Sequence, residues 1–170
     1  MRAIFLDLIG TLTPIEPEEW ENPSPETKKK IARIQRYLGA LKRSGVKLIV
    51  VSSVEKEGIS WLLHHFQYEK LVDEIHSTED EPIYHQGGKR QTALAKAEII
   101  RKVLREHGIN PRDSIMVGDG YVDREAALRA RVRPVLTHFL WSGKIKPYFD
   151  TQPLWKQPVF RMRYRKKAKP

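Results

Sequence analysis

Residues 2–12 read RAIFLDLIGTL, and this stretch decides how the rest of the chain is organised. Four apolar residues, Ala3–Leu6, lead to one carboxylate, Asp7, before the chain breaks at Gly10 and Thr11. An unbroken apolar run predicts a central strand of a parallel sheet, because such strands are buried on both faces. Asp7 would then lie at the carboxyl end of the strand, where open α/β sheets bind ligands. A lone aspartate there is more often only the cap of a turn, so the interpretation depends on residues downstream.

Helical and strand patterns alternate from this first strand to residue 136. A helix is expected from Ser24, its N-cap, to Gly45, which ends it. Further helices are predicted over Glu57–Phe66, Gln91–His107 and Val122–Ala130, and further strands over Val46–Val51, Leu71–Ile75, Ser114–Val117 and Val132–Leu136, with His76–Gly88 irregular. Alternation with short connections predicts a doubly wound parallel sheet with helices on both faces, a three-layer α/β/α architecture.

The chain of 170 residues fits one such domain, expected over residues 1–140. The loop Thr13–Pro23 is short, and Ser53–Gly88 holds only a helix, a strand and a loop, so neither segment has room for an extra domain above the sheet edge. Prolines and scattered aromatics over residues 141–160 suggest a segment that wraps the domain. Residues 161–170 carry six lysines and arginines and form a basic tail, either disordered or in contact with a phosphate-rich partner.

Composition restricts the class of protein further. The sequence contains no cysteine, so it forms no disulfides and has no thiolate chemistry. No apolar run approaches the ~20 residues that a membrane span needs, and the N-terminus does not resemble a signal peptide. We therefore expect a cytoplasmic protein without a membrane partner. The net charge of +10 favours anionic partners.

Further polar residues follow the predicted strands at the same relative position as Asp7. Ser52 comes directly after the second strand, and Asp119 and Asp123 follow a later one in the run Gly118-Asp119-Gly120-Tyr121-Val122-Asp123. The carboxyl ends of parallel strands meet at one edge, so these side chains should converge. Three carboxylates at one point repel one another, and a hard divalent cation relieves that repulsion. An all-oxygen site of this kind suits Mg²⁺.

Together these motifs resemble the haloacid dehalogenase-like hydrolases, a superfamily of phosphatases with an aspartate nucleophile. The resemblance runs from Arg2 to Leu136 and rests on FLDLIGTL, LIVVSS, a helix-borne lysine and MVGDGYVD followed by the REAALRARV helix. It implies a Rossmann-like fold of this superfamily and a phosphorylated substrate. The four motifs occur in the correct order on the expected elements, which makes the signal specific.

The resemblance also implies a role for each matching residue. Asp7 would be the nucleophile and first metal ligand, with Asp119, Asp123 and the backbone carbonyl of Ile9 completing the metal site. Ser52 would bind the phosphate, and Thr11 and Ser53 would contact the substrate. The lysine that stabilises the transferring phosphoryl group is either Lys96, on the helix, or Lys89, on the loop before it.

Ile9 is the main departure from the superfamily pattern. Phosphatases of this superfamily carry a second aspartate two residues after the nucleophile, where it protonates the leaving group and later activates water. Isoleucine can do neither, and general acid–base help is typically worth ~10²–10⁴ in rate. His85 and the pair His64-His65 are the candidates for a replacement acid, because histidine has a suitable pKa.

The preferred hypothesis is a capless, Mg²⁺-dependent phosphatase of weak or unusual specificity, favouring acyl or aryl phosphates. In this superfamily an open site suggests a large substrate, or a compact one supplied with a partner. The alternative is a catalytically degenerate member that binds phosphate, or nucleic acid through the Arg161–Lys169 tail. A third possibility is an assembly protein that docks a partner through Trp141 and Trp155.

Overall fold

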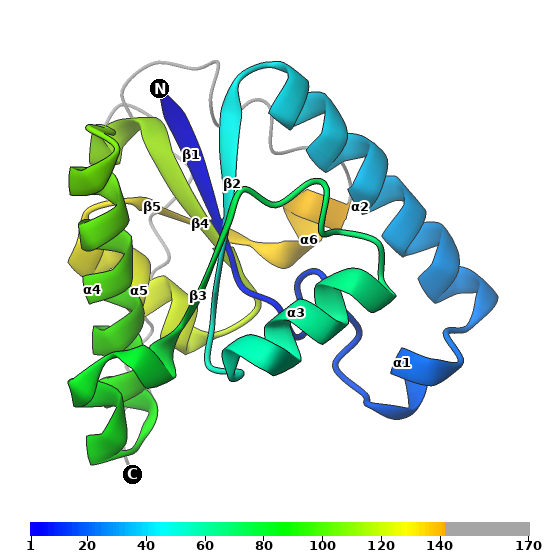
Figure 1. The fold of residues 1–170 in the computed structure, drawn as a ribbon, viewed down its shortest axis with the longest axis horizontal. Helices are drawn as coiled ribbons and strands as arrows, with labels where there is room; N and C mark the ends of the chain where they lie inside the picture. Colours follow the sequence, from blue (N-terminus) through cyan, green and yellow to red (C-terminus); the bar gives the residue numbers. More distant parts are fainter. Residues whose placement is uncertain (142–170) are drawn as a thin grey trace, which may run out of the picture.

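Five parallel strands form a single sheet in the computed structural model, which describes residues 1–141 (Figure 1). The strands lie in the order β3-β2-β1-β4-β5, so the first strand of the chain is the central one. Their bounds are β1 Arg2–Leu6, β2 Val46–Ser52, β3 Glu74–Ser77, β4 Ser114–Gly118 and β5 Arg133–Leu136. The predicted central position of the RAIFL run is therefore confirmed.

Helices cover both faces of the sheet and make the predicted three layers (Figure 1). On one face lie α2 (Pro25–Arg43), α3 (Lys56–His65) and the short α6 (Thr137–Trp141), with α1 (Glu18–Glu21) at the margin. On the other face lie α4 (Lys89–Glu106) and α5 (Tyr121–Ala130). Within residues 1–141, no second sheet or helical bundle covers the carboxyl edge of the strands.

The side chains of β1 divide between the two apolar cores because successive residues of a strand point to opposite faces. Ile4 and Leu6 pack with the core beneath α2 and α3, whereas Ala3 and Phe5 pack with the core beneath α4 and α5. All four side chains are fully buried. A strand between two helical layers has no solvent face, which explains the unbroken apolar run in the sequence.

The predicted ends of α2 are confirmed by the backbone. Ser24 caps the helix, and its hydroxyl oxygen accepts a hydrogen bond from the Thr27 amide at 3.2 Å. Gly45 follows the helix with φ +78°, a conformation that costs glycine little.

One strand begins later than predicted. The sequence pattern placed it at Leu71–Ile75, but β3 covers Glu74–Ser77. The amides of Leu71 and Val72 both donate to the Tyr68 carbonyl, which holds these apolar residues in a turn. The Asp73 carboxylate then accepts from the Leu48 amide at 2.8 Å and anchors the start of the strand. Apolar character alone could not separate this half-buried turn from a strand.

Two predicted loops contain short helices. The polar segment after β3 forms the 3-10 helices η1 (Thr78–Asp80) and η2 (Pro82–Gln86), and α1 lies within the loop over residues 13–23. Both segments are too short for hydrophobic periodicity to reveal a helix. None of the helices in the described part of the chain is long and apolar enough to span a membrane.

The C-terminal predictions are only partly covered by the described residues. Residues 142–170, which include Trp155 and the basic tail, lie outside them. Trp141 is half-buried, and its indole donates to the Thr11 carbonyl at 3.1 Å while Lys30 lies over its ring. Trp141 therefore packs within its own domain, and this contact weakens its predicted role in docking a partner.

Candidate active site

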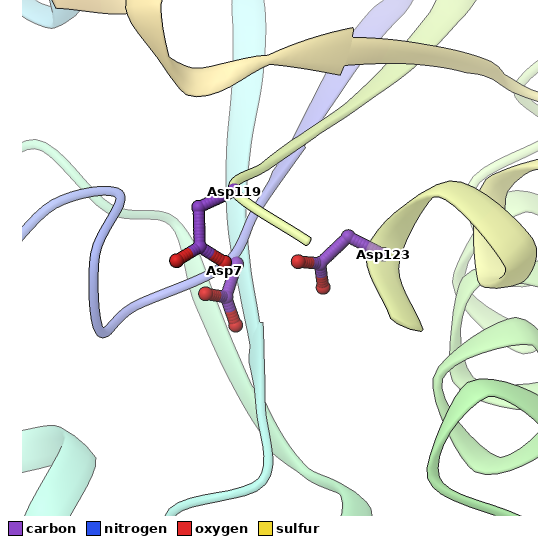
Figure 2. A group of neighbouring side chains, drawn as sticks. All are labelled: Asp7, Asp119 and Asp123. Atoms are coloured by element: carbon purple, nitrogen blue, oxygen red, sulfur yellow. The ribbon is translucent and has the colours of Figure 1, made fainter. Parts of the chain in front are cut away.

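Three aspartates converge at the carboxyl edge of the sheet, between β1 and β4 (Figure 2). The chain runs outward from β1 to β2 and β3, and then crosses to β4 and β5 on the other side, so the strand order reverses at this point. Asp7 directly follows β1, Asp119 follows β4, and Asp123 lies in the first turn of α5. One carboxylate oxygen from each lies within 4.8 Å of the others. The convergence expected from the sequence is present.

Two glycines allow the carboxylates to come this close to the backbone. A Cβ atom on Gly10 would lie 2.5 Å from Oδ2 of Asp119, and a Cβ atom on Gly118 would lie 2.3 Å from the carboxylate of Asp123. Gly10 also has φ +78°, which disfavours other residues. The glycines in the sequence motifs are therefore required by contact with the aspartates.

Lys96 bridges two of the three carboxylates from α4. Its Nζ atom donates to Asp7 Oδ1 at 2.7 Å and to Asp123 Oδ1 at 2.6 Å. The lysine is only 3% exposed, which is unusual for this residue type. Lys89, the alternative in the sequence, is exposed at the first residue of α4. The two are seven residues apart, about two helical turns, so only one of them can reach the aspartates.

Burial and mutual charge alter the titration of the site. Burial raises the pKa of Asp7 from 3.8 to about 6; the Lys96 ammonium opposes this change, and the Asp123 carboxylate adds to it. Burial and the charge of Asp123 also raise the pKa of Asp119. The pKa of Lys96 is raised although burial opposes it, because the Asp7 and Asp123 carboxylates stabilise the charged ammonium. Lys96 therefore remains charged.

The donor set fits a divalent cation. Three carboxylates and one ammonium leave two negative charges uncompensated when all are ionised. Burial is the main cause of the raised pKa of Asp7, and the Asp123 carboxylate adds to it. Carboxylate oxygens are the ligands that Mg²⁺ prefers. Asp7, Asp119 and Asp123 are therefore the residues that would hold the ion.

Ser52 and Ser53 differ in their surroundings. Ser52 is buried at the end of β2, and its hydroxyl oxygen accepts from the Val54 amide at 3.2 Å. As the acceptor in this bond, it keeps its own O–H for donation. Ser53 is exposed on the same loop. The assignment of either residue to phosphate binding stays a prediction.

Thr11 has a partner that the sequence did not reveal. Its hydroxyl lies 3.0 Å from that of Thr137, and both residues are buried. This bond joins the loop after β1 to the start of α6, 126 positions away. No local sequence signal could have identified Thr137, because its importance comes only from the fold. The bond favours a structural role for Thr11 over direct substrate contact.

Ile9 has an apolar side chain, and the histidines considered as replacement acids have other contacts in the structure. Ile9 is half-buried and packs against the core beneath α2 and α3. His85 contacts the Glu79 carbonyl, His64 pairs with Glu69, and His65 stacks on Trp61. Each histidine thus has a local contact unrelated to the three aspartates. The role predicted for the Ile9 carbonyl remains untested.

The close contact at Gly118 leads to a stability prediction. Gly118→Ala should lower the free energy of unfolding by about 2–3 kcal/mol, because the new methyl group overlaps the Asp123 carboxylate. Gly120→Ala is the matched control, since nothing lies within 4 Å of a Cβ atom there. It should cost less than about 1 kcal/mol, the penalty of a poorer N-cap. Urea denaturation measures both, and equal losses would contradict the close approach.

The raised pKa of Asp7 leads to a prediction about pH. The folded state binds this proton more tightly than the unfolded state, so the stabilisation is present at low pH and lost as pH rises through about 6. With EDTA present, the stability of the wild type relative to Asp7→Asn should fall by roughly 1–3 kcal/mol between about pH 4 and about pH 7. A difference that does not change with pH would mean that the pKa of Asp7 is not raised.

Comparisons with known proteins agree with this geometry. A sequence profile described as haloacid dehalogenase-like hydrolase matches residues 16–137, more than half of the chain. No curated protein matches the sequence. Among solved structures, a proposed β-phosphoglucomutase from Thermotoga maritima has a TM-score of 0.60 at 16% identity, with 84% of this chain and 97% of that chain covered.

Two further structures show the same fold. A subfamily IA hydrolase of the superfamily from Geobacter sulfurreducens has a TM-score of 0.55 at 19% identity, covering 80% of this chain and 89% of its own. The core domain of a proposed phosphoglycolate phosphatase from Streptococcus pneumoniae has a TM-score of 0.54 at 18% identity, with 79% of this chain and 78% of that chain covered. The sequence match over residues 16–137 shows that this chain belongs to the haloacid dehalogenase-like hydrolase family.

Proposed function

We propose that this protein is a Mg²⁺-dependent phosphatase that transfers a phosphoryl group to Asp7 and then hydrolyses the aspartyl phosphate. The observation that carries the proposal is the buried Lys96 ammonium, bonded to both Asp7 and Asp123 at the sheet edge. The name of the phosphatase among the structural neighbours supports the same reaction class.

In the first step, a carboxylate oxygen of Asp7 forms a bond to phosphorus while the bond from phosphorus to the leaving oxygen breaks. Attack by a carboxylate on a phosphate dianion brings like charges together, so positive charge must offset the repulsion. Lys96 supplies one such charge and fixes the orientation of Asp7 through Oδ1. A bound Mg²⁺ ion would supply the remaining neutralisation, held by Asp7, Asp119 and Asp123.

Ser52 completes the proposed binding site for the substrate phosphate. Its O–H can donate to a phosphate oxygen from the end of β2, two positions along the sheet from β4. In the second step, water attacks phosphorus, phosphate departs, and the Asp7 carboxylate is regenerated. The absence of a carboxylate at position 9 slows both steps for substrates whose leaving oxygen needs a proton.

The leaving group therefore determines which substrates react well. Aryl and acyl phosphates release a weakly basic oxygen and need little protonation, so they suit a site with Ile9. Within the described residues, no second sheet or helical bundle stands at the carboxyl edge of the strands, and Asp119 is exposed there, so a large substrate could approach from this side. A macromolecular phosphate is thus compatible with this arrangement.

The first prediction about catalysis concerns the nucleophile. Wild-type protein with Mg²⁺ should release p-nitrophenol from p-nitrophenyl phosphate, and Asp7→Asn should lower kcat by at least about 10³, because an amide cannot attack phosphorus. EDTA should abolish the wild-type rate. Asp113→Asn, an exposed residue in the 3-10 helix η3 (Pro111–Asp113), is the matched control and should leave the rate unchanged.

No release by either protein would favour the alternative function, a member of the family that binds phosphate without turnover. An active Asp7→Asn variant would show that another group is the nucleophile.

The second prediction concerns the missing acid. Ile9→Asp should raise kcat/KM for an alkyl phosphate such as glycerol 3-phosphate by about 10²-fold, and less for p-nitrophenyl phosphate, which needs little protonation. Ile9→Asn is the control for size and polarity without a titratable proton. If both substrates improve equally, or if Ile9→Asn gives the same gain, the missing acid is not what limits alkyl phosphates.

A further inference from the structure

A basic site lies at the opposite edge of the sheet from the aspartates. A hollow of about 620 Å³ is bounded by the C-terminal turns of α4 and α5 and by the residues that lead into β4 and β5. These segments adjoin the amino ends of the two strands, whereas Asp7 and Asp119 follow carboxyl ends. The length of a five-residue strand, roughly 16 Å, separates the two edges.

The hollow combines an apolar floor with a basic rim. Its floor is formed by Leu104, Ile109 and Ala130, which are buried and belong to the core beneath α4 and α5. Its rim carries four arginines, two from α4 and two from the end of α5: Arg101, Arg105, Arg129 and Arg131. Arginine matches phosphate and carboxylate groups through paired N–H donors.

Two of these arginines are held in place by neighbours. Arg101 pairs with Glu98 and donates a further bond to the Arg129 carbonyl at 2.9 Å, which connects α4 to α5. Arg129 pairs with Glu125 at 2.7 Å, while its Nε atom is buried and lacks a hydrogen-bond partner within residues 1–141. Their guanidinium groups are thus positioned before any ligand arrives.

The other two arginines differ from Arg101 and Arg129 in exposure and in charge pairing. Arg105 and Arg131 are exposed, and neither forms an ion pair with any residue in the described part of the chain. Arg131 also adopts the left-handed conformation at the C-cap of α5, with φ +60°. Glycine normally takes this position, so the arginine is kept there at some conformational cost.

The charge balance of the hollow is positive. Four guanidinium groups face two glutamates, Glu98 and Glu125, and two helix C-termini that each contribute about half a negative charge. About one positive charge remains after this compensation. The arginines therefore exceed what the two helix dipoles need.

We propose that this hollow binds a small molecule that carries two or more phosphate groups on an apolar or aromatic centre, such as a nucleoside diphosphate. The apolar floor would contact the ring system, and Arg105 and Arg131 would pair with the phosphates. The volume lies in the range of ~300–1,000 Å³ that is typical of small-molecule sites. The site is independent of the three aspartates and of the proposed hydrolysis.

Isothermal titration calorimetry with adenosine diphosphate tests this site. The full chain is used with EDTA, so that no metal recruits the probe to the aspartates. The wild type should show saturable binding with a Kd below about 1 mM. Arg105→Gln with Arg131→Gln should weaken it at least about tenfold, because hydrogen bonds between charged groups are lost.

Two controls separate this site from other causes of binding. Lys29→Gln with Arg36→Gln removes the same charge from the exposed face of α2 and should leave the Kd unchanged. Asp7→Asn should also leave it unchanged, because the aspartates do not take part. Melting temperatures check that the arginine variant remains folded.

Three outcomes would overturn the proposal. One is absence of saturable binding by the wild type. Another is equal weakening in the α2 control, which would indicate attraction by net charge alone. The third is unchanged affinity in the folded arginine variant, which would place adenosine diphosphate elsewhere on the chain.

Discussion

The contact between Lys96 and two aspartates is the interaction on which the site depends. Three carboxylates at one point of a sheet edge repel one another, and the burial of Asp7 and Asp123 makes that repulsion stronger. The buried ammonium offsets part of this energy through two short hydrogen bonds, at 2.7 Å to Asp7 and 2.6 Å to Asp123. The remaining negative charge is what suits the site to a cation and then to a phosphate.

The fold makes this contact possible by bringing three distant segments to one edge. The central strand places Asp7, its neighbour β4 places Asp119, and α5 directs Asp123 back toward them. Lys96 reaches the same point from α4, which packs against the face that α5 also covers. Gly10 and Gly118 leave room for the carboxylates. The rigid parallel sheet therefore fixes the relative positions of groups that would otherwise separate.

The same sheet separates two kinds of chemistry on its opposite edges. The carboxyl edge collects carboxylates, while the amino ends of β4 and β5 adjoin a hollow with four arginines. Helix C-termini attract basic residues through the helix dipole, yet the rim carries more charge than the two dipoles require. Ile9, two residues after Asp7, adds an apolar side chain beside the site and packs against the core beneath α2 and α3.

The sequence by itself determined the alternation of elements, the central position of β1 and the identity of the three aspartates. These follow from local patterns: a doubly buried strand has no polar face, and the end of such a strand is where a carboxylate can meet a ligand. Only the tertiary structure decided between Lys96 and Lys89 as the neighbour of Asp7, since both lie on α4 about two turns apart and only Lys96 lies at the level of the aspartates. Three other features could not be predicted from the sequence: the Thr11–Thr137 bond, the late start of β3 and the arginine-lined hollow. Each depends on residues that are far apart in the chain, or on a turn whose apolar side chains imitate a strand.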